Sequence, residues 1–277
     1  MFKEGNFDTG NVTINYAEGP QSGPPLVMIH GGGDRWQYFT PLLPTLAIRW
    51  QVFALDLRGH GASGRVTGQY RPEHYTADVT TFIEKIVDTP AALFGHSLGG
   101  WIALMAAAQL KERISALILG DPPLNLDRFL EVESTAERIG MWRWMRDITS
   151  AGMSVWELAA TLAEAQGIDT ASCLDAAAML SQVDPDVALY HAEGRLGEYI
   201  ENVCVEPSLK KLSCPVLLLS GNPEHGGVFI DGDVEMVLAS LENGIHARLD
   251  GTGHDLGLSD WEVTPMLRNI TNFLEAI

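Results

Sequence analysis

The sequence predicts an α/β fold, with a doubly wound, mostly parallel sheet that is interrupted by one helical insertion. Two observations favour this class. Short apolar runs alternate with helical patterns, and most of the runs are continuous, as in strands that are buried on both faces. The alternation stops at Asp121 and resumes near Val216, and the stretch between them contains only helical patterns.

The predicted strands are short apolar runs. They lie at residues 12–16, 26–29, 52–55, 91–94, 117–119, 216–219 and 247–249. Val79, Phe82, Ile83 and Ile86 have the spacing of one helix face, with Thr76 as the expected N-cap. Residues 98–110 form an Ala-rich helical pattern directly after the fourth strand. This βαβα order predicts helices on both faces of the sheet.

The insertion divides the chain into a core, residues 1–121 and 208–277, and a helical cap, residues 122–207. Ser154 and Glu157 form a capping-box pattern. Asp184 stands directly before Pro185, which is the arrangement of an N-cap residue followed by a proline at the first helical position. We expect the cap to lie over the carboxyl edge of the sheet, where open α/β sheets bind their ligands.

Composition excludes several classes of protein. The chain has 277 residues, 46% of them hydrophobic, and its net charge is −18 from 18 basic and 36 acidic residues. This composition excludes disorder, and the acidic charge argues against binding to nucleic acid or to anionic membranes. No apolar stretch approaches the length of a membrane span, and the first residues have no apolar leader, so a cytoplasmic location is expected.

The cysteines do not indicate a disulfide framework or a metal site. Only three are present, Cys173, Cys204 and Cys214, and none is closely spaced with another. We therefore expect neither a metal ion nor an organic cofactor.

Residues 95–100, Gly-His-Ser-Leu-Gly-Gly, follow a predicted strand and precede the Ala-rich helix. This strand–turn–helix context is that of a nucleophile elbow, in which the serine projects above the carboxyl edge of the sheet. Gly95 and Gly99 flank a turn where a Cβ atom would clash. The pattern predicts Ser97 as the nucleophile, and the helix N-terminus beneath it favours a developing oxyanion.

A nucleophilic serine needs a base and donors for the oxyanion. His254 lies in the loop after the last predicted strand, at the same sheet edge, and is the predicted base. His191, His225 and His246 are expected to be ordinary exposed or partly buried polar residues, whereas His30 begins the glycine-rich loop and His96 precedes the nucleophile. We expect the backbone N–H groups of Leu98 and Gly32 to form the oxyanion hole, with Gly33 as the alternative to Gly32.

These pieces together resemble the α/β-hydrolase superfamily, specifically its cap-bearing serine hydrolases of the esterase and lipase type. The segments that carry the resemblance are HGGGDRW at 30–36, DLRGHGAS at 56–63, GHSLGG at 95–100, LILGDPP at 117–123, PVLLLSG at 215–221 and GTGHD at 251–255. Dehalogenases and epoxide hydrolases of this fold use Asp where this chain has Ser97. His96 and Leu98 are more typical of esterases than of carbon–carbon-bond hydrolases.

The resemblance leaves two positions for the acid that orients the base. Glu224 stands three residues past Gly221, where most family members carry Asp, and it is the favoured candidate. Asp121 follows the strand after the nucleophile, a position from which some members take their acid. Asp231 and Asp233 are the remaining alternatives.

The cap contains the run Met141-Trp142-Arg143-Trp144-Met145, in which Trp142 and Met145 share one helical face. One interpretation is packing within the cap. The other is an apolar lining over Ser97, with Trp142, Met145 and Trp144 contacting substrate.

The resemblance implies a serine hydrolase that cleaves a carboxylic ester, a lactone or a thioester through an acyl-enzyme. The expected partner is a small ester-like molecule with an apolar part. A carbon–carbon-bond hydrolase or a cofactor-free perhydrolase would use the same three side chains and is the alternative. An alternative of another class is a ligand receptor that hydrolyses its ligand slowly.

Overall fold

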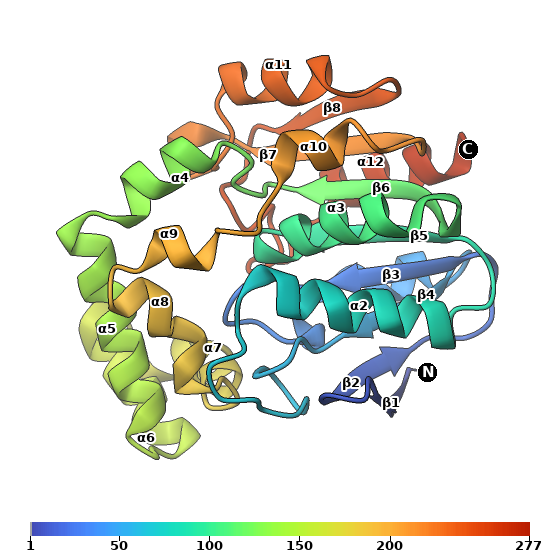
Figure 1. Cartoon of the computed structure of the whole chain (residues 1–277). Helices are drawn as coiled ribbons and strands as arrows, with labels where there is room; N and C mark the ends of the chain where they lie inside the picture. Colours follow the sequence, from blue (N-terminus) through green and yellow to red (C-terminus); the bar gives the residue numbers. More distant parts are fainter. Residues whose placement is uncertain (1) are drawn as a thin grey trace.

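Eight strands form one sheet in the computed structural model, which describes residues 2–277 (Figure 1). The strands follow the order β1-β2-β4-β3-β5-β6-β7-β8 across the sheet. They are β1 Lys3–Asp8, β2 Thr13–Glu18, β3 Pro25–Ile29, β4 Gln51–Leu55, β5 Ala91–His96, β6 Ile114–Gly120, β7 Val216–Gly221 and β8 Gly244–Leu249.

The six strands β4-β3-β5-β6-β7-β8, in their order across the sheet, all pair in parallel. Strand β2 pairs antiparallel with both β1 and β4. The doubly wound, mostly parallel sheet is therefore confirmed. Six predicted runs lie within strands and the first, 12–16, begins one residue before β2, but β1 was not predicted, because its residues are mostly polar and partly exposed. The carboxyl ends of the parallel strands meet at one edge, where the functional side chains gather.

Helices cover both faces of this sheet. Apolar residues of α2, α3, α10 and α11 pack on one face, and those of α1 and α12 pack on the other. None of the helices within residues 2–277 is long and apolar enough to cross a bilayer. The core helices are α1 Leu43–Leu46, α2 Pro72–Ile86, α3 Leu98–Leu110, α10 Val205–Leu209, α11 Asp231–Ala239 and α12 Thr264–Glu275, and three short 3-10 turns are η1 Trp36–Phe39, η2 Lys111–Arg113 and η5 Pro223–His225.

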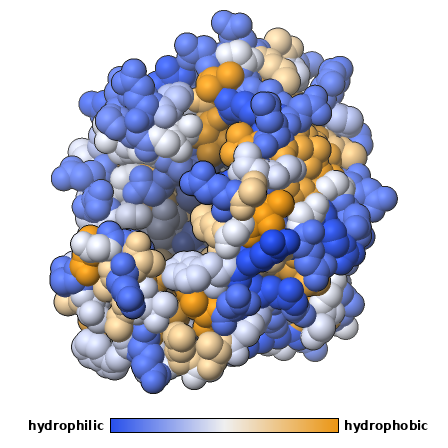
Figure 2. Space-filling view, turned by 90° about the vertical axis from the view of Figure 1, so that its left-hand side faces the viewer, coloured by the Kyte–Doolittle hydropathy of each residue, from blue (hydrophilic) through white to orange (hydrophobic). Residues whose placement is uncertain are grey.

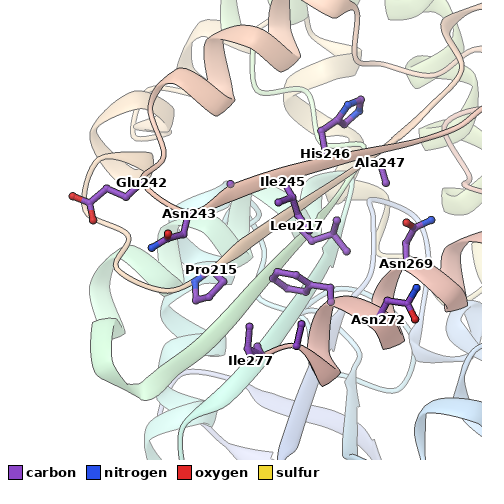
Figure 3. Close-up of a pocket in the computed structure, with 13 residues that line it drawn as sticks. Pro215, Leu217, Glu242, Asn243, Ile245, His246, Ala247, Asn269, Asn272 and Ile277 are labelled. Carbon is purple, nitrogen blue, oxygen red and sulfur yellow. The ribbon is translucent and has the colours of Figure 1, made fainter.

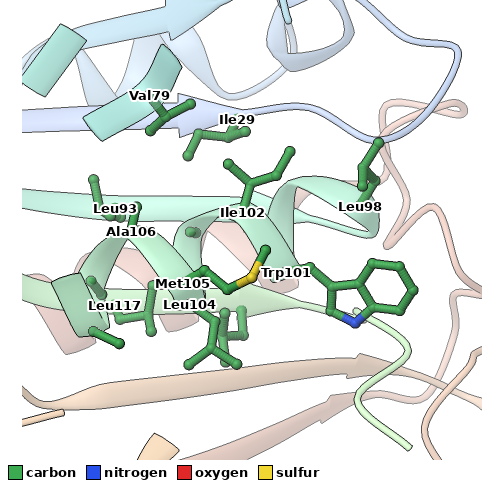
Figure 4. Packing of buried hydrophobic residues seen from close by; sticks show 14 of the residues in the cluster. Ile29, Val79, Leu93, Leu98, Trp101, Ile102, Leu104, Met105, Ala106 and Leu117 are labelled. Atoms are coloured by element: carbon green, nitrogen blue, oxygen red, sulfur yellow. The ribbon is translucent and has the colours of Figure 1, made fainter. Parts of the chain in front are cut away.

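Helix α3 packs on β5 and β6 and lies beside α2 on the same face of the sheet (Figure 1), and its apolar side chains fill this part of the core (Figure 4). Ile102 is fully buried, and Trp101 and Met105 are 2% and 7% exposed, so these three side chains belong to the core. Helix α2 begins at Pro72 with Arg71 as its N-cap, and Thr76 instead donates to the carbonyl of Pro72 inside the helix. The prediction that Thr76 caps this helix is wrong, because the helix starts one turn earlier.

Between β6 and α10 the described chain forms only helices, which lie beside the carboxyl edge of the sheet (Figure 1). We call residues 122–207 the cap segment; its division from the core at these residues stays a prediction. Ser154 and Glu157 exchange the two hydrogen bonds of the capping box, as predicted. The cap elements are α4 Leu126–Glu133, α5 Ala136–Ser150, α6 Val155–Gln166, η3 Thr170–Cys173, α7 Leu174–Leu180, η4 Pro185–Ala188, α8 Leu189–Ala192 and α9 Leu196–Tyr199.

Two buried histidines hold the glycine-rich loop after β3. The Nδ1–H of His30 donates to the carbonyl of Gly31 at 2.7 Å, and its Nε2 accepts from the N–H of Leu57. Nε2 of His60 accepts from the N–H of Gly33 at 3.1 Å. Burial lowers the pKa of His30 to about 4 and that of His60 to about 3. Both imidazoles are therefore neutral at neutral pH, which leaves each Nε2 free to accept.

Removing the charge of Asp78 should destabilise the core. Its carboxylate forms two hydrogen bonds, at 2.6 and 2.7 Å, with Arg58, and both residues are almost fully buried. Asp78→Asn leaves the guanidinium buried without a counter-charge, so we expect a loss of about 3–5 kcal/mol in the free energy of unfolding, measured by urea denaturation. The control is Glu275→Gln, which breaks the exposed pair with Arg49 and should cost less than about 1 kcal/mol. Equal losses would contradict the prediction.

The neutral state of His60 should make the protein less stable in acid. Its folded pKa lies below the unfolded value of about 6.5, so the unfolded chain binds a proton more readily between those values. Stability is therefore lost as pH falls from about 6.5 toward 3. His60→Gln keeps an acceptor for Gly33 but does not titrate. As pH falls, we expect the free energy of unfolding of the His60→Gln variant to decrease less steeply than that of the wild type. The two slopes should differ by about 1.4 kcal/mol per pH unit. Parallel slopes between pH 6 and 4 would refute this.

Candidate active site

Ser97 lies in a strained turn that joins β5 to α3. Its backbone has φ of 54° and ψ of −120°, in a region that side-chain-bearing residues rarely adopt. The turn is tight because glycines flank it. A Cβ on Gly95 would lie 2.1 Å from the carbonyl oxygen of Gly99, and one on Gly99 would lie 2.2 Å from that of Ile29. The strain fixes Ser97 at the carboxyl edge of the sheet.

His254 lies in the loop after β8 and contacts the serine directly. Its Nε2 is 2.9 Å from Oγ of Ser97, which can donate its proton to that nitrogen. The ring is accessible from outside, with 37% of the side chain exposed. His96 holds the loop from below, because its Nε2–H donates to the carbonyl of His254 at 2.7 Å. Burial lowers the pKa of His96 to about 4, so this neighbour adds no positive charge to the site.

Asp121 is the carboxylate beside His254. It follows β6 directly and is fully buried, and its Oδ2 accepts from Nδ1–H of His254 at 2.8 Å. The backbone N–H of Val228 donates to the same oxygen at 2.8 Å. The N–H groups of Gly221 and Phe229 donate more weakly to Oδ1, at 3.3 and 3.4 Å. These amides stabilise the ionised form of a carboxylate that water cannot reach.

The prediction that Glu224 orients His254 is wrong, and its alternative, Asp121, holds that position. Glu224 lies in the 3-10 turn η5, where its side chain is exposed and its backbone N–H donates to Asn222. The chain turns outward after β7 and then returns to present its amides to Asp121. Asp231 and Asp233 do not reach the histidine either: Asp231 pairs with Arg248, and Asp233 pairs with Arg128.

The two residues predicted to form the oxyanion hole, Leu98 and Gly32, both line the cavity at Ser97. Leu98 opens α3, where the first amides have no acceptor within the helix. Gly32 lines the same cavity as Ser97 and Leu98. The alternative donor, Gly33, is not available, because its N–H is engaged by His60.

A second carboxyl group, that of Asp34, lies close to Ser97 on the side of the glycine loop. A Cβ on Gly31 would lie 3.1 Å from Oδ2 of Asp34 and 3.2 Å from Cβ of Ser97. Burial raises the pKa of Asp34 to about 7. A large fraction of this carboxyl is therefore protonated at neutral pH, which reduces its repulsion of negative charge forming at Ser97.

A cavity of about 640 Å³ opens above Ser97, between the core and the cap segment. The space-filling view onto this side shows a hollow with both hydrophilic and hydrophobic side chains around it (Figure 2). The volume falls within the range of sites for small molecules. The core residues that line the cavity are Gly32, Ser97, Leu98, Trp101, Gly226, Gly227, Val228 and His254.

The cap segment contributes two helix faces to the cavity. Arg128, Phe129 and Val132 of α4 line it, followed by residues of α5, and the spacing in each helix is that of one face. Of the three substrate contacts predicted in α5, only Trp142 lies on the cavity. Met141 lines it instead of Met145, which is one turn further along, and Trp144 is 38% exposed.

Two arginines line the cavity, and each is paired with a carboxylate. Arg138 donates twice to Oε1 of Glu133, whose Oε2 accepts from Nε1–H of Trp142 at 2.8 Å. Arg128 forms an ion pair of 2.5 Å with Asp233 and also donates to the carbonyl of Val228. These groups, like His191 and Tyr199, were not predicted as part of the site, because only the packing of the cap segment brings them to the cavity.

A second hollow, of about 620 Å³, lies at the opposite ends of β7 and β8, beside α12 (Figure 3). Its walls include Leu217, Phe273 and Ile277, and no residue of the Ser97 site contributes to it. Within residues 2–277, no group of three or more His, Cys, Asp or Glu side chains could hold a metal ion. The Ser97 site is thus the place where a nucleophile, a base and an acid meet beside a cavity.

The comparisons with known proteins agree with the fold. Residues 24–148 match the family model described as the alpha/beta hydrolase fold. A 2-(acetamidomethylene)succinate hydrolase of Mesorhizobium japonicum is 32% identical over 114 residues, which are 41% of each chain. The chain spans about two fifths of the length of this relative and of others that match over short stretches. A 3-oxoadipate enol-lactonase of Acinetobacter baylyi is 25% identical over 80% of both chains.

Among solved structures, the N-formylmaleamic acid deformylase of Pseudomonas putida is similar over nearly the whole chain. It superposes with a TM-score of 0.76 and 17% identity, covering 96% of this chain and 99% of the deformylase. The matched fold extends over the cap segment as well as the core. The eight-stranded sheet, the serine at the turn after β5 and these likenesses show that the chain has the α/β-hydrolase fold.

Proposed function

We propose that this protein is a serine hydrolase that cleaves a carboxylic ester or a lactone through a covalent acyl-enzyme. The observation that carries the proposal is the continuous chain of hydrogen bonds from Asp121 through His254 to Ser97, with lengths of 2.8 and 2.9 Å. A serine hydroxyl is a weak nucleophile unless a base takes its proton, and this arrangement supplies an oriented base.

In the first half of the reaction, Oγ of Ser97 attacks the carbonyl carbon and its proton moves to Nε2 of His254. Asp121 fixes the imidazole tautomer that leaves Nε2 free to accept, and it stabilises the imidazolium that forms. The N–H groups of Leu98 and Gly32 donate to the oxyanion of the tetrahedral intermediate. His254 then gives its proton to the departing alcohol oxygen.

In the second half, water attacks the acyl-enzyme carbonyl while Nε2 of His254 accepts the proton from the water. The tetrahedral intermediate collapses, the C–O bond to Ser97 breaks, and His254 returns the proton to Oγ. The carboxylic acid leaves and the site is restored. The reaction consumes one water and needs only groups that this chain carries.

The cavity favours a small substrate with an apolar part, because Trp101, Phe129, Met141 and Trp142 form much of its wall. We include lactones because one relative is named an enol-lactonase. Turnover separates this proposal from a slowly hydrolysing receptor: we expect kcat above about 1 s⁻¹ on the best ester of a p-nitrophenyl panel.

The nucleophile can be tested by covalent labelling. A fluorophosphonate probe should label the wild type on Ser97, because the base activates this hydroxyl, and mass spectrometry of the digested protein would locate the adduct. Ser97→Ala should remain unlabelled, and His254→Ala should react much more slowly. Labelling of the Ser97→Ala variant at the wild-type rate would refute the proposal.

The acid can be tested with a matched pair of amides. Asp121→Asn keeps the shape of the side chain but favours the wrong tautomer of His254, and the corresponding change in serine proteases lowers kcat by about 10⁴. We expect a loss on the order of 10³–10⁴ in kcat for this variant, measured on the best ester. Glu224→Gln is the control, because that carboxylate is exposed and away from His254, and its kcat should stay within a few-fold of wild type. A larger loss for Glu224→Gln than for Asp121→Asn would overturn the assignment.

A further inference from the structure

His191 is a buried polar group in the cap segment that has no partner. Several buried side-chain nitrogens and oxygens within residues 2–277 lack a hydrogen bond, and Nδ1 of His191 is the one among them that belongs to a cavity-lining residue. Its Nε2 is not among these fully buried atoms and hydrogen-bonds with no described residue, so it is the ring nitrogen that a ligand in the cavity can reach. A polar group in a largely buried side chain costs about 1–3 kcal/mol when it stays unpaired, so Nε2 beside the cavity points to a ligand.

Aromatic rings fix the position of this imidazole. The ring centroid of His191 lies 4.4 Å from that of Trp142 and 4.6 Å from that of Tyr199, and the residue is only 7% exposed. Burial lowers its pKa to about 4, so the ring is neutral at neutral pH. A neutral imidazole has one N–H donor and one nitrogen acceptor.

The charges around His191 are already compensated. Both oxygens of Glu133 are engaged, one by Arg138 and the other by Trp142. Arg128, the second arginine on the cavity, is paired with Asp233. An anionic ligand would have to compete with these carboxylates, and it would approach a chain whose net charge is −18. The cavity therefore favours an uncharged hydrogen-bonding group beside His191.

We propose that His191 is a specificity-determining residue that hydrogen-bonds a hydroxyl group of the substrate, remote from the bond that is cleaved. A hydroxyl both donates and accepts, so it can satisfy either tautomer of the neutral ring. The substrate class is then a hydroxylated ester or lactone, whose apolar middle lies against Trp101 and Phe129 and whose carbonyl lies at Ser97. This inference rests on the proposed function for the location of the carbonyl.

Binding without turnover tests the inference. In a Ser97→Ala background, calorimetry would compare ω-hydroxyalkanamides of increasing length with alkanamides that carry a methyl group in place of the hydroxyl. We expect the hydroxyl compound of the best length to bind more tightly than its methyl partner. His191→Phe keeps an aromatic ring against Trp142 but removes both nitrogens, and it should reduce this preference about fivefold to tenfold.

Two further variants make the result specific. His191→Gln retains a neutral donor and acceptor and should keep part of the preference, whereas Met141→Leu changes the cavity wall without a polar group and should keep all of it. An unchanged preference in His191→Phe would overturn the inference. The absence of any hydroxyl preference, or of any binding, in the Ser97→Ala protein itself would also overturn it. That measurement does not depend on whether a His191 variant folds.

A third ligand series separates hydroxyl from anion recognition. If ω-carboxyalkanamides bind best, and Arg138→Gln removes that advantage, the cavity selects a carboxylate and the inference is wrong. Failure of the proposed function is visible independently, as the loss of fluorophosphonate labelling at Ser97 in the wild type. A protein that is labelled normally but shows no hydroxyl preference would retain the proposed function and lose only the role of His191.

Discussion

The burial of the Asp121 carboxylate is the constraint on which the rest of the site depends. A carboxylate with no exposed surface stays ionised only if the surrounding groups replace the water it has lost. Here the replacement comes from one imidazole and three backbone amides, contributed by the last residue of β7 and by the loops after β7 and β8. The loop after β7 must therefore bend back over Asp121, and this path carries Glu224 outward into solvent.

The same constraint explains which parts of the site could be predicted. The strands and the turn at Ser97 depend on local patterns, namely continuous apolar runs and glycines where a Cβ would clash, so the sequence predicts them directly. His254 was predictable because the loop that follows β8 begins at the carboxyl edge. The choice between Glu224 and Asp121 depended on the path of the chain between β7 and α11. No local sequence pattern sets that path. It depends on which carboxylate accepts hydrogen bonds from the backbone N–H groups of the loop.

The cavity wall was the least predictable part, for a similar reason. Helix periodicity shows which residues of α5 share a face, but not which face meets the core. Trp142 was chosen for its residue type and does line the cavity, whereas Met145 shares its face and lies one turn too far along. His191 gave no signal in the sequence, because an isolated histidine in a helical stretch is typical of many surfaces. β1 was missed because its residues are partly exposed and too polar to form an apolar run.

The cap segment and the core are also joined through the loop after β7, whose N–H groups donate to Asp121. Arg128 of α4 donates to the carbonyl of Val228, and the N–H of Val228 donates to Asp121. Asp233, at the start of α11, pairs with Arg128 and accepts from Asn125, which caps α4. Helix α4 is thus hydrogen-bonded to the same loop whose amides donate to the Asp121 carboxylate. Because one residue carries both contacts, a shift of α4 would move an amide donor of Asp121. The position of the cap segment, and with it the shape of the cavity, is therefore coupled to the orientation of the base.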